Sequence, residues 1–309
     1  MSGALRRARV RVPCSTSNLG SGYDTIGLAL DRYLEATFTP TDADGLELVR
    51  EGTLAGLSIS DGPDLVAETF RGELARAGIE ARGVLSLTST IPVARGLGSS
   101  AAGMLAAYDL ARAVRGLPRA DEEAFEKTLA REGHGDNAAP CLYGGLCAVA
   151  HTPDGTAVIE LPLSESVGFA YAAPAAGLTT ESARGALPAK VPHKSAALAL
   201  GRLAALIRGL AEGSAELIAI GVHDELHVPY RLPLIPGAVD AMAAASDAGA
   251  WAVTISGAGS GLIAICDPER APAVAEAMRV VLDAGEGNPE CVGFAVRPDF
   301  GGLRRLLPT

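Results

Sequence analysis

A glycine-rich segment directly before a helical pattern constrains this chain more than any other feature. The segment runs from Ile91 to Ala101 and reads IPVARGLGSSA. Gly96 and Gly98 allow the backbone to curl with consecutive N–H groups pointing inward, and the helix expected over Ser99–Val114 adds unpaired amides and the positive end of its dipole. The pattern predicts an anion cradle suited to a triphosphate. The serines at the helix start can cap the helix and can offer a hydroxyl to Mg²⁺.

Other interpretations of this segment also follow from the residues. Ser99 can be a simple N-cap after a turn. Gly96-x-Gly98-x-x-Ala101 satisfies a loose dinucleotide fingerprint, but that fingerprint follows its strand directly, whereas Pro92 and three more residues intervene here. A P-loop is excluded because the chain contains no Gly-Lys pair.

Composition narrows the class of protein. The 309 residues carry a net charge of −10, so no basic surface is expected for a nucleic-acid partner. Only three residues are lysines, so phosphate chemistry must depend on arginine, backbone amides or a metal. The five cysteines form no CxxC pair and are expected to be reduced, buried side chains. No apolar run reaches the roughly 18–20 residues of a membrane helix, and we expect a soluble cytoplasmic protein with no membrane partner.

Apolar periodicity predicts an α+β chain of two domains rather than a doubly wound sheet, because strands and helices do not alternate regularly. The boundary is expected near residues 150–167, around the turn His151–Gly155, with domains 1–155 and 156–309. The expected strands are Val10–Pro13, a strand pair within Leu28–Pro40, Val84–Thr90, Leu146–Val149, Val158–Pro162, one from about Phe169, Trp251–Ser256, Leu262–Cys266 and Cys291–Val296. The expected helices are Asp64–Ala77, Ser99–Val114, Asp121–Glu132, Ala196–Leu210, Ala238–Ala248 and Ala273–Ala284.

Two further polar segments carry candidate binding side chains. Val12–Asp24 is predicted to be a strand and a glycine-containing loop that presents Asn18 and Asp24, although such residues in isolation are most often turn formers. The string EGHGDN occupies Glu132–Asn137. We interpret His134 within it as a hydrogen-bonded loop histidine rather than a catalytic base, and the spacing is poor for zinc.

Taken together, these segments resemble the GHMP kinases. The glycine segment matches their phosphate motif PxxxGLGSSAA nearly letter for letter, and Val12–Asp24 is similar to PATSANLGPGFD. Glu132–Gly145 resembles EGHPDNVAPALYGG, the string most diagnostic of the homoserine kinase branch. Thr180–Pro188 and Asp224–Pro236 resemble its T-x-x-A-R-x-x-L-P and D-x-L-H-x-P-Y-R stretches, and Ser256–Leu262 resembles SGAGPT. The motifs occur in the family order over nearly the whole chain.

The resemblance implies an N-terminal ribosomal-protein-like α/β domain and a C-terminal ferredoxin-like domain with ATP between them. It implies Mg²⁺ on Ser100 and Glu126, with Ser99 as the alternative hydroxyl, although a glutamate on so acidic a helix is normally only solvated. Asp64 falls where the family often has an adenine-contacting asparagine. The implied phosphate-binding residues are Pro92, Arg95, Gly96, Leu97, Gly98, Ser99, Ser100 and Ala101.

The implied reaction transfers the γ-phosphoryl group of ATP to the side-chain hydroxyl of L-homoserine, and the family suggests a homodimer. Arg184 and Arg231 would hold the α-carboxylate, a task suited to planar guanidinium groups, although without this context each is a surface ion-pair partner. Asn137 takes the place of the aspartate base of other GHMP kinases, so no strong general base is expected. The implied substrate-binding residues are Asn18, Asp24, Asn137, Thr180, Arg184 and Arg231, with Asn137, Asn18 and Asp24 assigned to catalysis.

Some positions depart from the family pattern. Tyr23 replaces phenylalanine, Gly135 replaces proline, and Ser260-Gly261 replaces Pro-Thr, which removes a threonine hydroxyl. Two alternative functions stay open: another GHMP kinase acting on threonine, pantoate or mevalonate, and a non-catalytic ligand-binding regulator on the same fold. Intact Ser99, Ser100 and Glu126 argue against the regulator, because a binding protein has no need of metal ligands.

Overall fold

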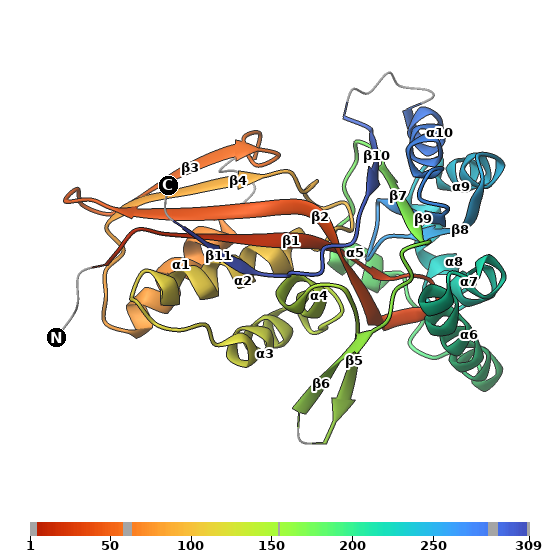
Figure 1. The fold of residues 1–309 in the computed structure, drawn as a ribbon, viewed down its shortest axis with the longest axis horizontal. Coiled ribbons are helices and arrows are strands. Elements are labelled where there is room, and N and C mark those ends of the chain that lie inside the picture. The colour runs from red at the N-terminus through yellow and green to blue at the C-terminus, as the bar shows by residue number, and fades with distance from the viewer. Residues whose placement is uncertain (1–4, 58–63, 154, 284–289, 308–309) are drawn as a thin grey trace.

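The computed structural model describes residues 5–57, 64–153, 155–283 and 290–307, which form two β-sheets with helices packed on them (Figure 1). The first sheet contains β1 (Ala8–Asn18), β2 (Gly22–Pro40), β3 (Leu46–Gly52), β4 (Gly83–Ser89), β5 (Leu146–Thr152), β6 (Gly155–Leu161) and β11 (Arg304–Leu306). The second contains β7 (Gly168–Ala173), β8 (Ala250–Ile255), β9 (Leu262–Cys266) and β10 (Val292–Val296). The α-helices are α1 (Leu65–Arg76), α2 (Ser99–Ala113), α3 (Asp121–Glu132), α4 (Ala138–Tyr143), α5 (Thr180–Gly185), α6 (His193–Glu212), α7 (Ala215–Val222), α8 (Val228–Arg231), α9 (Ala238–Asp247) and α10 (Ala271–Asp283).

The first sheet is organised around β2, which is one strand of 19 residues and not the strand pair expected from the sequence. Its first part pairs with β5, with Ile26 opposite Ala148, and its second part pairs with β4, with Leu34 opposite Ser89. The two parts of β2 therefore pair with different strands of the same sheet. β3 and β4 are parallel, and α1 makes the crossover between them.

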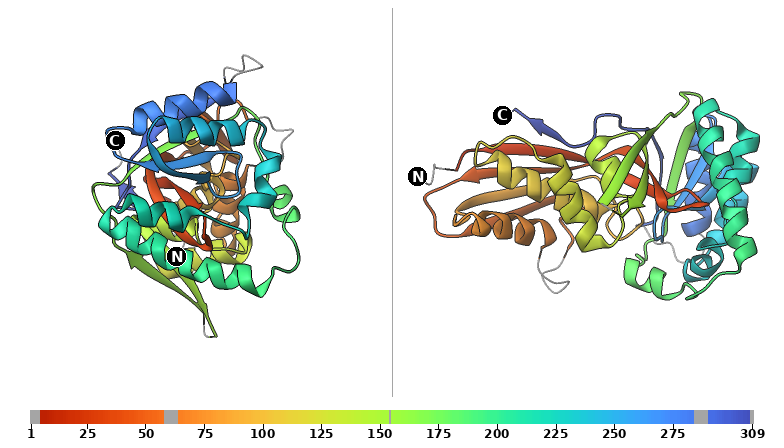
Figure 2. Two further views of the ribbon diagram at one scale, coloured as in Figure 1. Left: turned by 90° about the vertical axis from the view of Figure 1, so that its right-hand side faces the viewer. Right: turned by 90° about the horizontal axis from the view of Figure 1, so that it is seen from below.

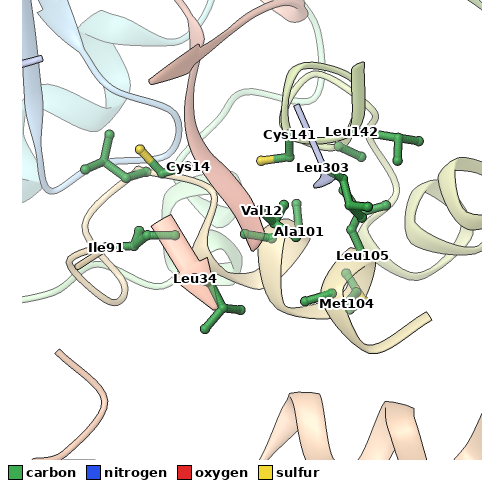
Figure 3. Close-up of a cluster of buried hydrophobic side chains, with 14 of the residues drawn as sticks. Val12, Cys14, Leu34, Ile91, Ala101, Met104, Leu105, Cys141, Leu142 and Leu303 are labelled. Carbon is green, nitrogen blue, oxygen red and sulfur yellow. The ribbon is translucent and has the colours of Figure 1, made fainter. Parts of the chain in front are cut away.

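Helices α1, α2 and α3 cover one face of this sheet, as the view from below in Figure 2 shows. Twelve residues of α2 are buried, and most of them are alanine, glycine or leucine. These small side chains let the helix that follows the glycine segment lie deep in the core, where β1, α2 and α4 contribute apolar side chains (Figure 3). The start of α2 is consequently held rigidly.

The second sheet has the strand order β10-β7-β9-β8 with every pair antiparallel. In chain order the elements run β7, helices, β8, β9, α10, β10, which is the ferredoxin-like arrangement that the resemblance implied. A separate cluster of small buried side chains joins this sheet to α9 and α10. In Figure 2 these helices lie at the outer end of the molecule.

The two sheets do not divide the chain at residue 155. β6 begins at Gly155 and pairs antiparallel with β5, so the turn at His151–Gly155 is a hairpin turn within the first sheet. This hairpin projects from the body of the protein (Figure 1). The chain also returns to the first sheet at its end, where β11 pairs with β1.

All five cysteines are free and buried, as expected. Among the helices within the described ranges, none combines the length and apolar character that crossing a membrane requires.

Candidate active site

A cleft of about 330 Å³ lies where the glycine segment, the N-terminal loop and the second sheet meet. It brings together most of the residues selected from the sequence, although Asn18 and Arg231 are more than 200 positions apart in the chain. Its lining includes Asn18, Asp24, Arg95, Gly96, Leu97, Gly98, Ser99, Ser100, Asn137, Thr180, Arg184 and Arg231. Pro92 and Ala101 are buried and do not line it.

Backbone contacts between two glycine-rich loops shape the phosphate side of the cleft. A Cβ added to Gly96 would lie 2.0 Å from the carbonyl oxygen of Ser256, so no side chain fits there. The Ser256 hydroxyl donates to the Gly96 carbonyl at 2.6 Å. Gly98, with φ of 61°, is the residue that caps α2, and Ser99 is the first residue inside the helix. Ser99 is therefore not an N-cap, and both serines of the segment stand at the open amide end of α2.

The Arg95 side chain has a structural task. Its guanidinium donates to the carbonyl oxygens of Ala175, at 2.7 Å, and Glu290, at 2.9 Å. These bonds connect the glycine segment to the second sheet, and they occupy the donors that the resemblance assigned to phosphate.

The carboxylate that lines the cleft with the two serines is Glu132, whereas Glu126, expected as the partner of Ser100, lines a different hollow. Glu126 is exposed and lines a different hollow, with Glu122, Phe125 and Tyr143 among its neighbours there. Glu132 lines the cleft together with Ser99 and Ser100. Six residues along an α-helix correspond to about 600°, so the two side chains leave α3 in different directions.

Glu132 has the character of a metal ligand. Its Oε2 atom is buried and has no hydrogen-bond partner, a costly state unless a cation satisfies it. Burial raises the pKa of the Glu132 carboxyl, while nearby His134 and Ser100 oppose that rise. Within the described ranges there is no group of three or more His, Cys, Asp or Glu side chains able to hold a metal. One carboxylate, one hydroxyl and substrate phosphates are the ligand set that Mg²⁺ commonly uses.

The opposite side of the cleft carries paired charges. Arg184 donates from Nη2 to Asp24 Oδ1 at 2.8 Å and from Nη1 to Asp24 Oδ2 at 3.2 Å. Arg231 is only 2% exposed and donates to the carbonyl oxygens of Ala183 and Gly257, both at 3.3 Å. A carboxylate next to two guanidinium groups complements a zwitterion, since the former attracts an ammonium and the latter a carboxylate.

Asn18 and Asp24 hold the loop between β1 and β2 in an unusual backbone conformation. Their φ angles are 73° and 51°, in the left-handed region that non-glycine residues rarely occupy. The Asn18 side chain stabilises this loop, because its Nδ2 donates to the Gly257 carbonyl at 2.7 Å and its Oδ1 accepts from the Asp24 amide at 2.9 Å. Asn18 therefore positions Asp24 for the cleft.

Asn137 is held at the centre of the cleft by two serines. Its Oδ1 accepts from the Ser15 hydroxyl at 3.0 Å, and its Nδ2 donates to the Ser17 hydroxyl at 3.0 Å. His134 lies nearby with its Nδ1 2.5 Å from Asp136 Oδ1. Burial lowers the pKa of His134, but the hydrogen bond and charge of Asp136 outweigh it and raise the pKa overall. His134 thus holds its proton tightly, which suits the interpretation that it is not a base.

Asp64 lies in a second, mostly apolar hollow of about 230 Å³ that shares Val93, Ser99 and Ser100 with the cleft. Its Oδ1 accepts from the Ala67 amide at 2.9 Å and caps α1, and its Oδ2 lies 3.8 Å from Arg50. An apolar slot with one carboxylate next to a phosphate cradle has the size and character of a nucleobase site.

The sequence is similar to known proteins over most of its length. Residues 62–145 match the family described as GHMP kinases N terminal domain, and residues 197–283 match GHMP kinases C terminal. A homoserine kinase of Synechococcus sp. (strain CC9311) is 41% identical over 278 residues, and one of Prochlorococcus marinus (strain MIT 9313) is 38% identical. The alignments cover 87% and 88% of both chains, respectively.

Solved structures are similar in fold. The crystal structure of homoserine kinase from Cytophaga hutchinsonii superposes with a TM-score of 0.84 at 27% identity and covers 99% of both chains. L. major mevalonate kinase superposes with a TM-score of 0.73 at 15% identity, over 96% of this chain and 99% of the other, a likeness of fold alone.

Proposed function

Because the chain belongs to the homoserine kinases of the GHMP kinase family, we propose that its cleft transfers the γ-phosphoryl group of ATP to the side-chain hydroxyl of L-homoserine. One observation carries the assignment to this cleft: the amide end of α2 and the Asp24–Arg184 pair line the same cavity. A phosphate cradle and a zwitterion site in one cavity are what this transfer requires.

The proposed ATP site extends over both hollows. The amides of Gly96–Ser100 bind the phosphates, and the apolar hollow beside Asp64 holds the adenine, whose amino group can donate to that carboxylate. Ser100 and Glu132 hold Mg²⁺, with Ser99 as the alternative hydroxyl. When bound, Mg²⁺ neutralises charge on the phosphate oxygens.

The proposed homoserine site is the opposite side of the cleft. Arg184 and Arg231 bind the α-carboxylate, Asp24 accepts from the ammonium, and Thr180 contributes its hydroxyl. Asn137 faces the acceptor hydroxyl and orients it towards the γ-phosphorus. In the transfer, the hydroxyl oxygen forms a bond to phosphorus, the bond from phosphorus to the β,γ-bridging oxygen breaks, and ADP leaves.

Positioning supplies most of the catalysis in this proposal. The Asn137 amide is neutral and already bonded to Ser15 and Ser17, so it cannot accept the hydroxyl proton. His134 is paired with Asp136, and its raised pKa favours the protonated imidazolium, which has no free lone pair to accept a proton. The acceptor proton therefore leaves late, to an oxygen of the transferred phosphoryl group and then to solvent, without a strong protein base, as expected for a loose phosphoryl-transfer transition state.

ATP consumption in the presence of Mg²⁺ tests the proposal. Homoserine, threonine, mevalonate and pantoate are compared at equal concentrations, and homoserine is expected to give the highest kcat/KM. Mevalonate and pantoate lack the ammonium group that would donate a hydrogen bond to Asp24. Threonine carries a secondary hydroxyl one carbon closer to the α-carbon, farther from the phosphate cradle. Binding of ATP with no turnover of the four substrates would favour a ligand-binding regulator instead.

We also propose a homodimer. Apolar side chains exposed on neighbouring helices support it, with Leu200 of α6 72% exposed and Ile220 of α7 48% exposed. Sedimentation equilibrium measures the assembly directly, and a monomer at micromolar concentration would contradict the proposal.

A further inference from the structure

Tyr23 stands behind the two arginines that face the proposed substrate carboxylate. It is the residue before Asp24, and it does not itself line the cleft. Its hydroxyl is a departure from the family pattern, which has phenylalanine at this position. Any effect of Tyr23 on the substrate must therefore act through its neighbours.

The hydroxyl group of Tyr23 and the Asp24 carboxylate share the guanidinium of Arg184. The hydroxyl accepts from Arg184 Nη1 at 3.3 Å. Arg184 in turn donates to both oxygens of Asp24. Burial, followed by the charge of Asp24, raises the pKa of Tyr23, so the neutral hydroxyl is favoured beside that carboxylate.

The ring of Tyr23 contacts the second arginine, Arg231. Arg231 Cζ lies 5.3 Å from the ring centroid, within the range of a cation–π contact. His227 stacks on the same tyrosine with ring centroids 5.0 Å apart. His227 Nε2 lies 3.0 Å from the Gly20 carbonyl and must donate to it, so Nδ1 is left to accept from Arg231 Nη1 at 3.4 Å.

We propose that Tyr23 is a positioning residue that fixes the guanidinium groups of Arg184 and Arg231 relative to each other, so that both meet one substrate carboxylate. This inference rests on the proposed function, because the carboxylate is that of the amino-acid substrate. The ring alone would hold Arg231. The hydroxyl adds the link to Arg184, whose own side chain is 36% exposed and, among the described residues, is otherwise anchored by its pairing with Asp24.

Steady-state kinetics of Tyr23→Phe and Tyr23→Leu test the proposal. Loss of a hydrogen bond to a charged group predicts a rise of about threefold to tenfold in the KM for homoserine in Tyr23→Phe, with kcat within about twofold and the KM for ATP unchanged. Tyr23→Leu also removes the support of Arg231 and is expected to raise the homoserine KM further. Tyr33→Phe is the matched control, since it removes a tyrosine hydroxyl bonded to Asp299 at 2.8 Å outside the cleft and should leave both KM values unchanged.

A double-mutant cycle with Arg184→Gln separates positioning from a general effect on the fold. In the Arg184→Gln background, Tyr23→Phe is expected to change kcat/KM by less than about twofold, because the partner of the hydroxyl is gone. Additive effects, a loss confined to kcat, or an equal change in Tyr33→Phe would overturn the inference. Wild-type turnover in the same assay tests the proposed function separately: if another α-amino acid is the better substrate, the cycle is measured with that substrate.

Discussion

The backbone of Gly98 lies directly against the side chain of Asn137. A Cβ added to Gly98 would be 2.8 Å from Asn137 Oδ1 and 2.4 Å from the Ser15 hydroxyl. The residue that caps the phosphate-binding helix and the residue proposed to face the acceptor hydroxyl are therefore in contact, with no room for a side chain between them. In the proposed function, this contact would set how close the nucleotide and the acceptor come to each other.

Gly98→Ala is expected to lower kcat/KM by at least about 100-fold, because the added methyl group displaces Asn137 and a misplacement near 1 Å has this effect. The left-handed backbone at Gly98 adds a loss of about 1–2 kcal/mol in the free energy of unfolding. Coupled-assay kinetics and urea unfolding measure the two effects. Gly201→Ala is the control, since its Cβ meets nothing within 4 Å and a helical alanine is at least as stable as glycine. Wild-type kinetics for Gly98→Ala would contradict the assignment of this contact.

Glu132→Gln is expected to reduce kcat about 100-fold or more and to raise the Mg²⁺ concentration needed for half-maximal activity, because a neutral amide replaces a charged metal ligand. Glu126→Gln is the matched control on the same helix and should keep activity within about twofold, since its side chain lies in another hollow. Activity measured as a function of Mg²⁺ concentration for the wild type, Glu132→Gln and Glu126→Gln shows which glutamate supports metal binding. If Glu126→Gln were the more damaging change, the metal assignment given by the sequence would be restored.

Glu132→Gln is also expected to change how stability depends on pH. Burial raises the pKa of Glu132 in the folded protein above its unfolded value, so folding takes up a proton between the two. The free energy of unfolding should therefore fall as pH rises from the ordinary glutamate range through the raised pKa. The glutamine variant lacks this contribution, so the stability of the wild type relative to the variant should decrease over the same window. Urea unfolding of both proteins at a series of pH values without Mg²⁺ measures it, and parallel curves would show that Glu132 does not titrate differently on folding.

Asn137→Ala should lose far more turnover than His134→Ala. We expect a loss of at least about 100-fold for Asn137, which orients the acceptor, and less than about tenfold for His134, which contributes only its charge and its bond to Asp136. Single-turnover rates with saturating ATP compare the two variants, and circular dichroism checks that both fold. The opposite ranking would indicate chemistry driven by the histidine.

Much of the architecture could be predicted because local patterns agreed with the final fold. α2 and α3 begin at the residues expected, and Gly133 ends α3 in the left-handed conformation that favours glycine. β3 was not predicted, because its residues Leu46–Gly52 alternate weakly and are completed by parallel pairing with β4, far along the chain. The predicted boundary region, residues 150–167, contains both the β5–β6 hairpin turn and the connection from β6 to β7, because a turn between short strands has the same composition as a short linker.

The site was predictable where a motif specified the backbone conformation. It was less predictable where the direction of a side chain decided whether the residue lines the cleft. The glycine segment and the loop carrying Asn18 meet in one cleft as expected. Glu132 was overlooked as a ligand although it begins the EGHGDN string, because spacing along α3 does not reveal which face looks into the cleft. The Arg95 guanidinium donates hydrogen bonds to the carbonyl oxygens of Ala175 and Glu290. No local sequence pattern connects these two residues with Arg95.

The pairing of β11 with β1 has a consequence for biosynthesis. β1 is synthesised long before β11, so it gains this neighbour only when residues 304–306 have emerged from the ribosome. During translation, the backbone groups of Val10 and Arg11 face an open sheet edge, the kind of surface on which nascent chains associate wrongly. Removal of residues 300–309 would leave every residue that lines the cleft in place, but it would remove β11 and expose the edge of β1.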